Sequence, residues 1–90
     1  MLNPIYSNQF KKDYKRCQKR SCRMKNLLAV MSDLEAEKPL AKKYREHPLQ
    51  GNYANFTECH IEPDWLLIYQ IDKEQNEIYF VRTGTHSDLF

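Results

Sequence analysis

Three histidines in the second half of the chain, His47, His60 and His86, are the residues best suited to chemistry. The unperturbed pKa of histidine lies near neutrality, so its side chain can give or take a proton without large tuning. One such histidine alone is more often structural or simply exposed. All three, however, lie near predicted strand ends or in adjacent loops, where functional sites usually form. We therefore treat them as candidate acid–base residues, together with Asp64, which follows His60 across a predicted turn.

A metal site is the main alternative for these side chains. Three histidines with Cys59 or Asp64 would be a sufficient ligand set for zinc. Cys59 and His60, however, are neighbours on a predicted strand and should point to opposite faces of the sheet. The chain has no HxxxH or CxxC pair, and Cys17 and Cys22 do not have the spacing of a zinc motif. We therefore predict no metal and no cofactor.

Two aromatic residues, Trp65 and Phe90, could contact a substrate. Trp65 opens the predicted central strand, where most tryptophans belong to the core, but it could also be a platform on which a base stacks. Phe90 is the last residue of the sequence, and an apolar side chain there contributes little to the fold unless it packs against the domain.

The charge is distributed unevenly although the net charge is only +2. Residues 1–45 carry twelve Lys and Arg against four Asp and Glu, whereas residues 46–90 carry two against eight. Between residues 11 and 25, Asp13 is the only acid among Lys11, Lys12, Lys15, Arg16, Lys19, Arg20, Arg23 and Lys25. Such a field attracts polyanions, of which nucleic acid is the abundant one. A solvated helix face explains the charge alone equally well.

The composition excludes several classes of protein. With only two glycines, Gly51 and Gly84, the chain cannot form a GxGxxG turn or a GxxxxGK[ST] phosphate loop. Its longest apolar runs, 27–31 and 65–69, fall far short of the roughly 20 residues of a membrane span. The start lacks a secretion pattern, and three cysteines suit a reducing compartment. We expect one domain, residues 1–90, in the cytoplasm and without a membrane partner.

The hydrophobic pattern predicts the order β-αα-βββ. Residues 2–6 suit a short strand, and Phe10, Tyr14 and Cys17 mark one face of a helix that Ser7 can cap. A second helix, which Ser21 can cap, should end before Pro39. Strands are expected at 53–61, 65–71 and 78–83. These elements indicate a small α+β domain with a two-helix hairpin packed on one face of an antiparallel-rich sheet.

Three segments resemble the YafQ subfamily of the RelE-type bacterial toxins, the toxin halves of type II toxin–antitoxin pairs. They are HPLQG at 47–51, ECHIEPDWLLIYQI at 58–71 and VRTGTHSDLF at 81–90. The first half of the chain is similar only in its pattern of a short strand and a basic helical hairpin. The resemblance implies the RelE-like fold, which is similar to that of microbial ribonucleases.

The resemblance also implies a metal-independent endoribonuclease that cuts mRNA in the A site of the translating ribosome. By similarity, the RNA 2′-hydroxyl attacks the adjacent phosphorus and expels the 5′-oxygen of the next nucleotide. The products are a 2′,3′-cyclic phosphate and a 5′-hydroxyl. Such a reaction needs a base, an acid and positive charge near the non-bridging oxygens.

By similarity, His47, His60, Asp64 and His86 match the acid–base set of the family. We expect His86 to be the general acid, and His60 with Asp64 to form the base side. His47 would share the base role or orient the phosphate. Arg82 is the only arginine after residue 45 and is the candidate for phosphate stabilisation.

The resemblance assigns substrate contacts as well. Trp65 and Phe90 match positions next to the substrate. The helical basic residues would lie against 16S ribosomal RNA or an acidic antitoxin: Lys11, Lys12, Lys15, Arg16, Lys19, Arg20 and Arg23. Operator DNA would be reached only through the antitoxin. Thr57 departs from the family, where many relatives carry arginine, so the alternative is a weakly active relative that acts mainly as an antitoxin-binding corepressor.

Overall fold

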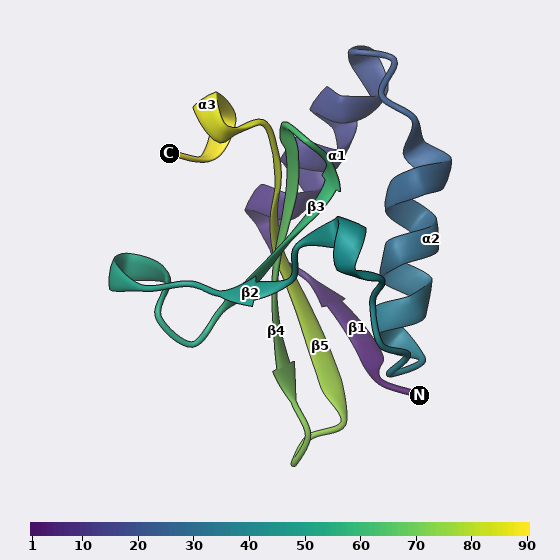
Figure 1. Ribbon diagram of the computed structural model, residues 1–90, viewed down its shortest axis with the longest axis vertical. Coiled ribbons are helices and arrows are strands. Elements are labelled where there is room, and N and C mark those ends of the chain that lie inside the picture. The colour runs from purple at the N-terminus through teal and green to yellow at the C-terminus, as the bar shows by residue number, and fades with distance from the viewer.

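A five-stranded sheet in the order β1-β5-β4-β3-β2 is the framework of the computed structural model, which describes residues 1–90 (Figure 1). Its strands are β1 (Asn3–Tyr6), β2 (His47–Pro48), β3 (Thr57–Glu62), β4 (Trp65–Asp72) and β5 (Glu77–Gly84). β1 runs parallel to β5, and the other neighbouring strands are antiparallel. The helices are α1 (Asn8–Lys19), α2 (Met24–Glu35) and α3 (His86–Leu89), with 3₁₀ turns η1 (Lys42–Tyr44) and η2 (Gly51–Tyr53). The predicted α+β order is confirmed, and β2 and α3 are additions to it.

The central strand β4 is covered on both faces, as its continuous apolar run predicts. Leu67 and Tyr69 belong to the main core, to which α1 and α2 contribute. Leu66 and Ile68 point to the opposite face, where they pack with Leu89 of α3. This second, smaller cluster fixes the C-terminal helix on the face of the sheet that α1 and α2 leave open.

Two local boundaries differ from the sequence-based expectation. β3 begins at Thr57 instead of residue 53, because η2 and the left-handed Asn55 (φ +78°) hold the preceding segment in turns. Ser7 does cap α1: its hydroxyl accepts the Phe10 N–H at 2.9 Å and donates to the Val81 carbonyl at 2.8 Å. Ser21 does not cap α2, since it adopts φ +60° in the interhelical turn, and α2 starts after Arg23 without a side-chain cap.

No helix of the structure is both long enough and apolar enough to cross a membrane.

Asp13 is completely buried and joins α1 to β5. Its carboxylate accepts hydrogen bonds from Arg82 Nε at 2.7 Å, Arg16 Nη2 at 3.0 Å and the Thr83 backbone N–H at 3.2 Å. Burial raises the pKa of this carboxyl, but the hydrogen bonds from Arg82, Gln9 and Thr83 outweigh that effect and the pKa is lowered. The carboxylate is therefore charged, and every donor around it depends on that charge.

We expect Asp13→Ala to destabilise the fold by about 3 kcal/mol, because removing the carboxylate leaves Arg82 Nε–H and a buried backbone N–H without an acceptor. Urea unfolding would measure the loss. Asp33→Ala is the matched control, since Asp33 also lies on a helix but its side chain forms no ion pair or hydrogen bond. The effect of the control should stay within about 0.5 kcal/mol. Equal stability losses in the two variants would contradict a special role for Asp13.

Candidate active site

The first part of the site is a cluster of His47, Glu58 and His60 on the face of the sheet opposite α1 and α2. Side chains alternate along β3, so Cys59 and Ile61 enter the main core while Glu58 and His60 face the other way. β2 pairs His47 directly with Glu58. The Nε2 atoms of both histidines lie 3.4 Å from the same Glu58 oxygen, Oε1. The Glu58 side chain is only 7% exposed, and the two histidine rings are its ion-pair partners.

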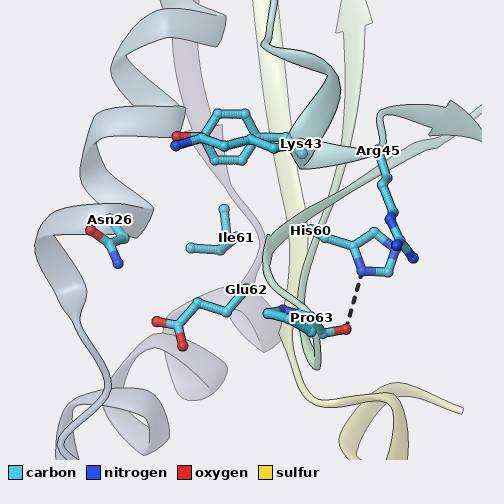
Figure 2. Close-up of a pocket in the computed structure, with 8 residues that line it drawn as sticks. Asn26, Lys43, Arg45, His60, Ile61, Glu62 and Pro63 are labelled. Carbon is cyan, nitrogen blue, oxygen red and sulfur yellow. Dashed lines mark hydrogen bonds between the residues drawn. The ribbon is translucent and has the colours of Figure 1, made fainter.

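Backbone carbonyls set the tautomer of both rings. His47 Nδ1 lies 2.7 Å from the Arg45 carbonyl, and His60 Nδ1 lies 3.3 Å from the Pro63 carbonyl (Figure 2). A carbonyl only accepts, so each Nδ1 carries the hydrogen and each Nε2 turns toward Glu58. Oε1 of Glu58 therefore lies within reach of a hydrogen on either Nε2, an arrangement that is chemically suited to accept a proton.

The second part of the site is a dyad of Asp64 and His86. Asp64 lies in the turn between β3 and β4, and His86 is the first residue of α3. One carboxylate oxygen, Oδ1, accepts the His86 backbone N–H at 3.0 Å and its Nδ1–H at 2.6 Å. These bonds, the backbone one first, lower the pKa of Asp64. His86 Nε2 is left for a substrate, and the side chain is 55% exposed.

The three histidine rings lie in a row. The centroids of His47 and His60 are 6.1 Å apart, and those of His60 and His86 are 5.8 Å apart. The row joins the cluster around Glu58 to the Asp64–His86 dyad. Asp64 lies on the His86 side, which differs from the expectation that Asp64 and His60 would form the base side together.

Asp88 fixes α3, and with it His86, against α1. Its carboxylate accepts the Thr85 N–H at 3.0 Å in a capping box and receives both terminal nitrogens of Arg20, at 2.7 and 3.2 Å. Arg16 approaches the same carboxylate at 3.6 Å. Gly84 makes room for this contact, because a Cβ there would lie 2.9 Å from both Arg16 and Asp88. Arg16 and Arg20 therefore also serve the fold, and their contact with RNA stays a prediction.

The structure revises the prediction for Trp65 and shows protein partners for Arg82 and Phe90. Trp65 is 6% exposed and donates its Nε1–H to Thr83 Oγ1 at 2.9 Å, so it is a core residue and not a stacking platform. Arg82 forms an ion pair with the buried Asp13, and its side chain is 19% exposed, so its guanidinium has a structural role whether or not it contacts phosphate. Phe90 is 63% exposed, and its ring meets Tyr53 edge-on at 5.7 Å.

The remaining basic residues between positions 11 and 25 are exposed and form no ion pair: Lys11, Lys12, Lys15, Lys19, Arg23 and Lys25. The turn between α1 and α2 lies close to the dyad. A cavity of about 340 Å³ there is lined by Arg20 and Arg23 together with Asp64 and Thr85. The positive charge of the hairpin thus extends to the edge of the site.

The His47–Glu58–His60 cluster also has the atoms of a metal site. Its potential ligand atoms all lie within 4.8 Å of one another, and two imidazoles with one carboxylate suit zinc or copper. The set differs from those considered from the sequence, because Cys59 is buried on the opposite face and Asp64 binds His86. The absence of a metal stays a prediction.

Glu58 is the site residue that the sequence analysis missed. It lies two positions before His60 on the same strand, so the period of two places both side chains on one face. This spacing is enough to predict that Glu58 lies beside His60. The pairing of His47 with Glu58 could not be predicted, because β2 is too short to be read from a pattern.

Comparisons with known proteins give a consistent result. Residues 2–90 match the family model described as the bacterial toxin of type II toxin–antitoxin systems, YafQ. The chain belongs to the YafQ toxin family. It is 43% identical over 86 residues to the mRNA interferase toxin YafQ of Escherichia coli K12, an alignment that covers 94% of this chain and 91% of the relative.

Two solved structures are also similar to this toxin. The metal-bound toxin from Helicobacter pylori is 47% identical with a TM-score of 0.94, and the match covers 100% of both chains. The E. coli DinJ–YafQ complex contains a chain that is 41% identical with a TM-score of 0.89, over 100% of this chain and 99% of that one. The family and the RelE-like α+β fold inferred from the three sequence motifs are therefore confirmed.

We expect Asp88→Ala to destabilise the protein by about 1 kcal/mol at neutral pH, because α3 loses its capping box. The matched control is Ser87→Ala, an exposed neighbour in α3 that should change little. Urea unfolding at several pH values would measure both.

The pH dependence of this loss has a definite sign. The Arg20 side chain holds the pKa of Asp88 far below its ordinary value of 3.8. A group with a lowered native pKa stabilises the fold above its unfolded pKa, and this contribution is lost as the pH falls through the native one. The difference between wild type and Asp88→Ala should therefore shrink below about pH 4. A difference that stays constant down to pH 2 would contradict the assignment.

Proposed function

We propose that this toxin is an endoribonuclease that cuts mRNA in the A site of the translating ribosome without a metal ion. The observation that carries the proposal is the row of histidines, which joins an exposed His86–Asp64 dyad to the cluster around the buried Glu58. The mRNA interferase name of the E. coli relative supports the same activity. The basic hairpin beside the dyad supports a polyanionic substrate.

The reaction needs one group that takes a proton and one that gives it. The 2′-oxygen attacks the adjacent phosphorus, and its proton passes to the cluster, where Glu58 and the flanking Nε2 atoms hold it. The bond from phosphorus to the 5′-oxygen breaks, and His86 Nε2 protonates that oxygen. The products are a 2′,3′-cyclic phosphate and a 5′-hydroxyl, and no oxidant, reductant or cofactor is consumed.

Each carboxylate has a distinct task in this scheme. Asp64 orients the His86 ring through Nδ1 and stabilises its protonated form, as a carboxylate partner does in other histidine dyads. Glu58 lies behind His47 and His60, and the ring that has taken the proton carries a positive charge near the non-bridging oxygens, where negative charge builds in the transition state. Arg82 adds positive charge nearby while it remains bonded to Asp13.

A cognate antitoxin is the second partner in this proposal. The E. coli relative is found in a complex with DinJ. The exposed cations of α1 suit an acidic, disordered segment that folds on binding, and operator DNA would be reached only through such an antitoxin. Co-expression of the antitoxin should relieve growth arrest.

We expect His86→Ala to lower mRNA cleavage by about 100-fold or more, because the leaving oxygen loses its proton donor. Mapping RNA 5′ ends after brief induction in cells would measure the cleavage. Ser87→Ala is the control, since it changes the neighbouring exposed residue of the same helix. Undiminished cutting by His86→Ala would refute the acid role, and arrest without cutting would favour a sequestering corepressor.

Treatment with EDTA should leave the cleavage rate unchanged, whereas added Zn²⁺ or Cu²⁺ should inhibit it. A metal on His47, Glu58 and His60 would occupy the atoms that otherwise accept the proton. The cleavage rate on programmed ribosomes would measure both effects, with Mg²⁺ added in excess over EDTA so that the free Mg²⁺ concentration stays constant. Loss of activity in EDTA that Zn²⁺ restores would show that the cluster works as a metal centre instead.

A further inference from the structure

A cavity of about 400 Å³ lies beside His60, at the free edge of β3 (Figure 2). β2 pairs only with Thr57 and Glu58, so β3 has no neighbouring strand on that side from Cys59 onward. η1 and the first turns of α2 approach this edge and leave the cavity between them. The residues that matter for its chemistry are Asn26, Lys43, Tyr44, Arg45, His60 and Glu62.

Four polar side chains of this cavity form no ion pair or hydrogen bond in the protein. Lys43, Arg45 and Glu62 form no ion pair, and the Asn26 side chain forms no hydrogen bond. Lys43 Nζ lies 5.1 Å from the centre of the Tyr44 ring, which forms part of the wall. The fold therefore does not account for these groups, which come from three separate segments and meet next to a histidine of the site.

The position of the cavity defines which ligand could reach it. His60 belongs both to the cavity wall and to the row of histidines. If the scissile phosphate of an RNA strand lies on that row, the nucleotide next to this phosphate must lie near His60. The volume is adequate for a nucleotide, since small-molecule sites have about 300–1,000 Å³.

Two kinds of contact are available to such a nucleotide. Lys43 and Arg45 are exposed cations that suit its phosphate, a contact that fixes position without recognising the base. Glu62 can only accept hydrogen bonds from a base edge, whereas the amide of Asn26 can both donate and accept. A carboxylate favours a base that presents an amino group over one that presents a carbonyl oxygen at that place.

From these observations we infer that the cavity is a subsite for the nucleotide flanking the scissile phosphate. It favours a base with an exocyclic amino group over uracil, with Glu62 as the specificity-determining residue and Lys43 as a phosphate contact. The inference rests on the proposed function, because it assumes that the histidine row holds the scissile phosphate.

Base preference tests the role of Glu62. Programmed ribosomes would carry A-site codons that differ only in cytosine or uracil on either side of the cut, and single-turnover rates would be compared. For wild type we expect a preference of about tenfold for cytosine at one flanking position. Glu62→Gln should bring that ratio close to one, because the glutamine amide can also donate to uracil. Glu74→Gln, on the exposed loop between β4 and β5, should keep the wild-type ratio.

Substrate affinity tests the role of Lys43. Lys43→Ala should raise KM about tenfold and leave kcat unchanged, as expected for loss of one phosphate contact remote from proton transfer. Lys42→Ala is the matched control, because Lys42 is the neighbouring residue of η1 and does not line the cavity. A wild-type base ratio in Glu62→Gln, or equal KM values for the two lysine variants, would overturn the subsite while leaving the proposed function intact.

A binding measurement separates the two proposals if wild type cuts no RNA at all. That result would overturn the proposed function. The uncut protein would then be titrated with cytidine 5′-monophosphate and with uridine 5′-monophosphate, and the backbone amide NMR signals of Lys43 and Glu62 followed. Larger shifts with the cytidine nucleotide would support the subsite. Equal shifts, or none at these residues, would overturn it.

Discussion

The buried carboxylate of Asp13 is the constraint on which the arrangement of this toxin depends. It is a charge with no exposure to water, so it can persist only while Arg82, Arg16 and a backbone N–H of β5 surround it. Arg16 also approaches Asp88, which holds α3. One charge in α1 therefore fixes the end of β5 and, through a shared arginine, the helix that carries His86.

This network divides the cations of the hairpin into two groups. Arg16 and Arg20 point to the sheet and α3, where their charge neutralises buried or half-buried carboxylates. The lysines of α1 stay in solvent, where their charge is available to a polyanion. The unusual density of positive charge in the hairpin thus combines a structural requirement with a surface field, and composition alone does not separate the two.

How well a part of the structure can be predicted depends on how far apart in the sequence its interacting residues lie. The β-αα-βββ order and the two-sided burial of β4 depend on local periodicity, which the sequence displays directly. The buried state of Trp65 and the pairing of Arg20 with Asp88 depend on contacts between residues distant in the chain, so the alternatives could not be decided beforehand. Glu58 is intermediate: its face was predictable from His60, but its contact with His47 required the two-residue strand β2.

The two carboxylates of the site differ in environment, and this difference fits the direction of proton transfer in the proposed mechanism. Asp64 is 67% exposed and binds a ring whose outer nitrogen faces solvent, so the dyad can be reprotonated directly from water. Glu58 is shielded by His47 and His60, so in the proposed mechanism a proton accepted there would remain close to the phosphate and balance its charge. An exposed donor and a shielded acceptor are suited to opposite roles, which explains why similar residue types at the two ends of the row would not be interchangeable.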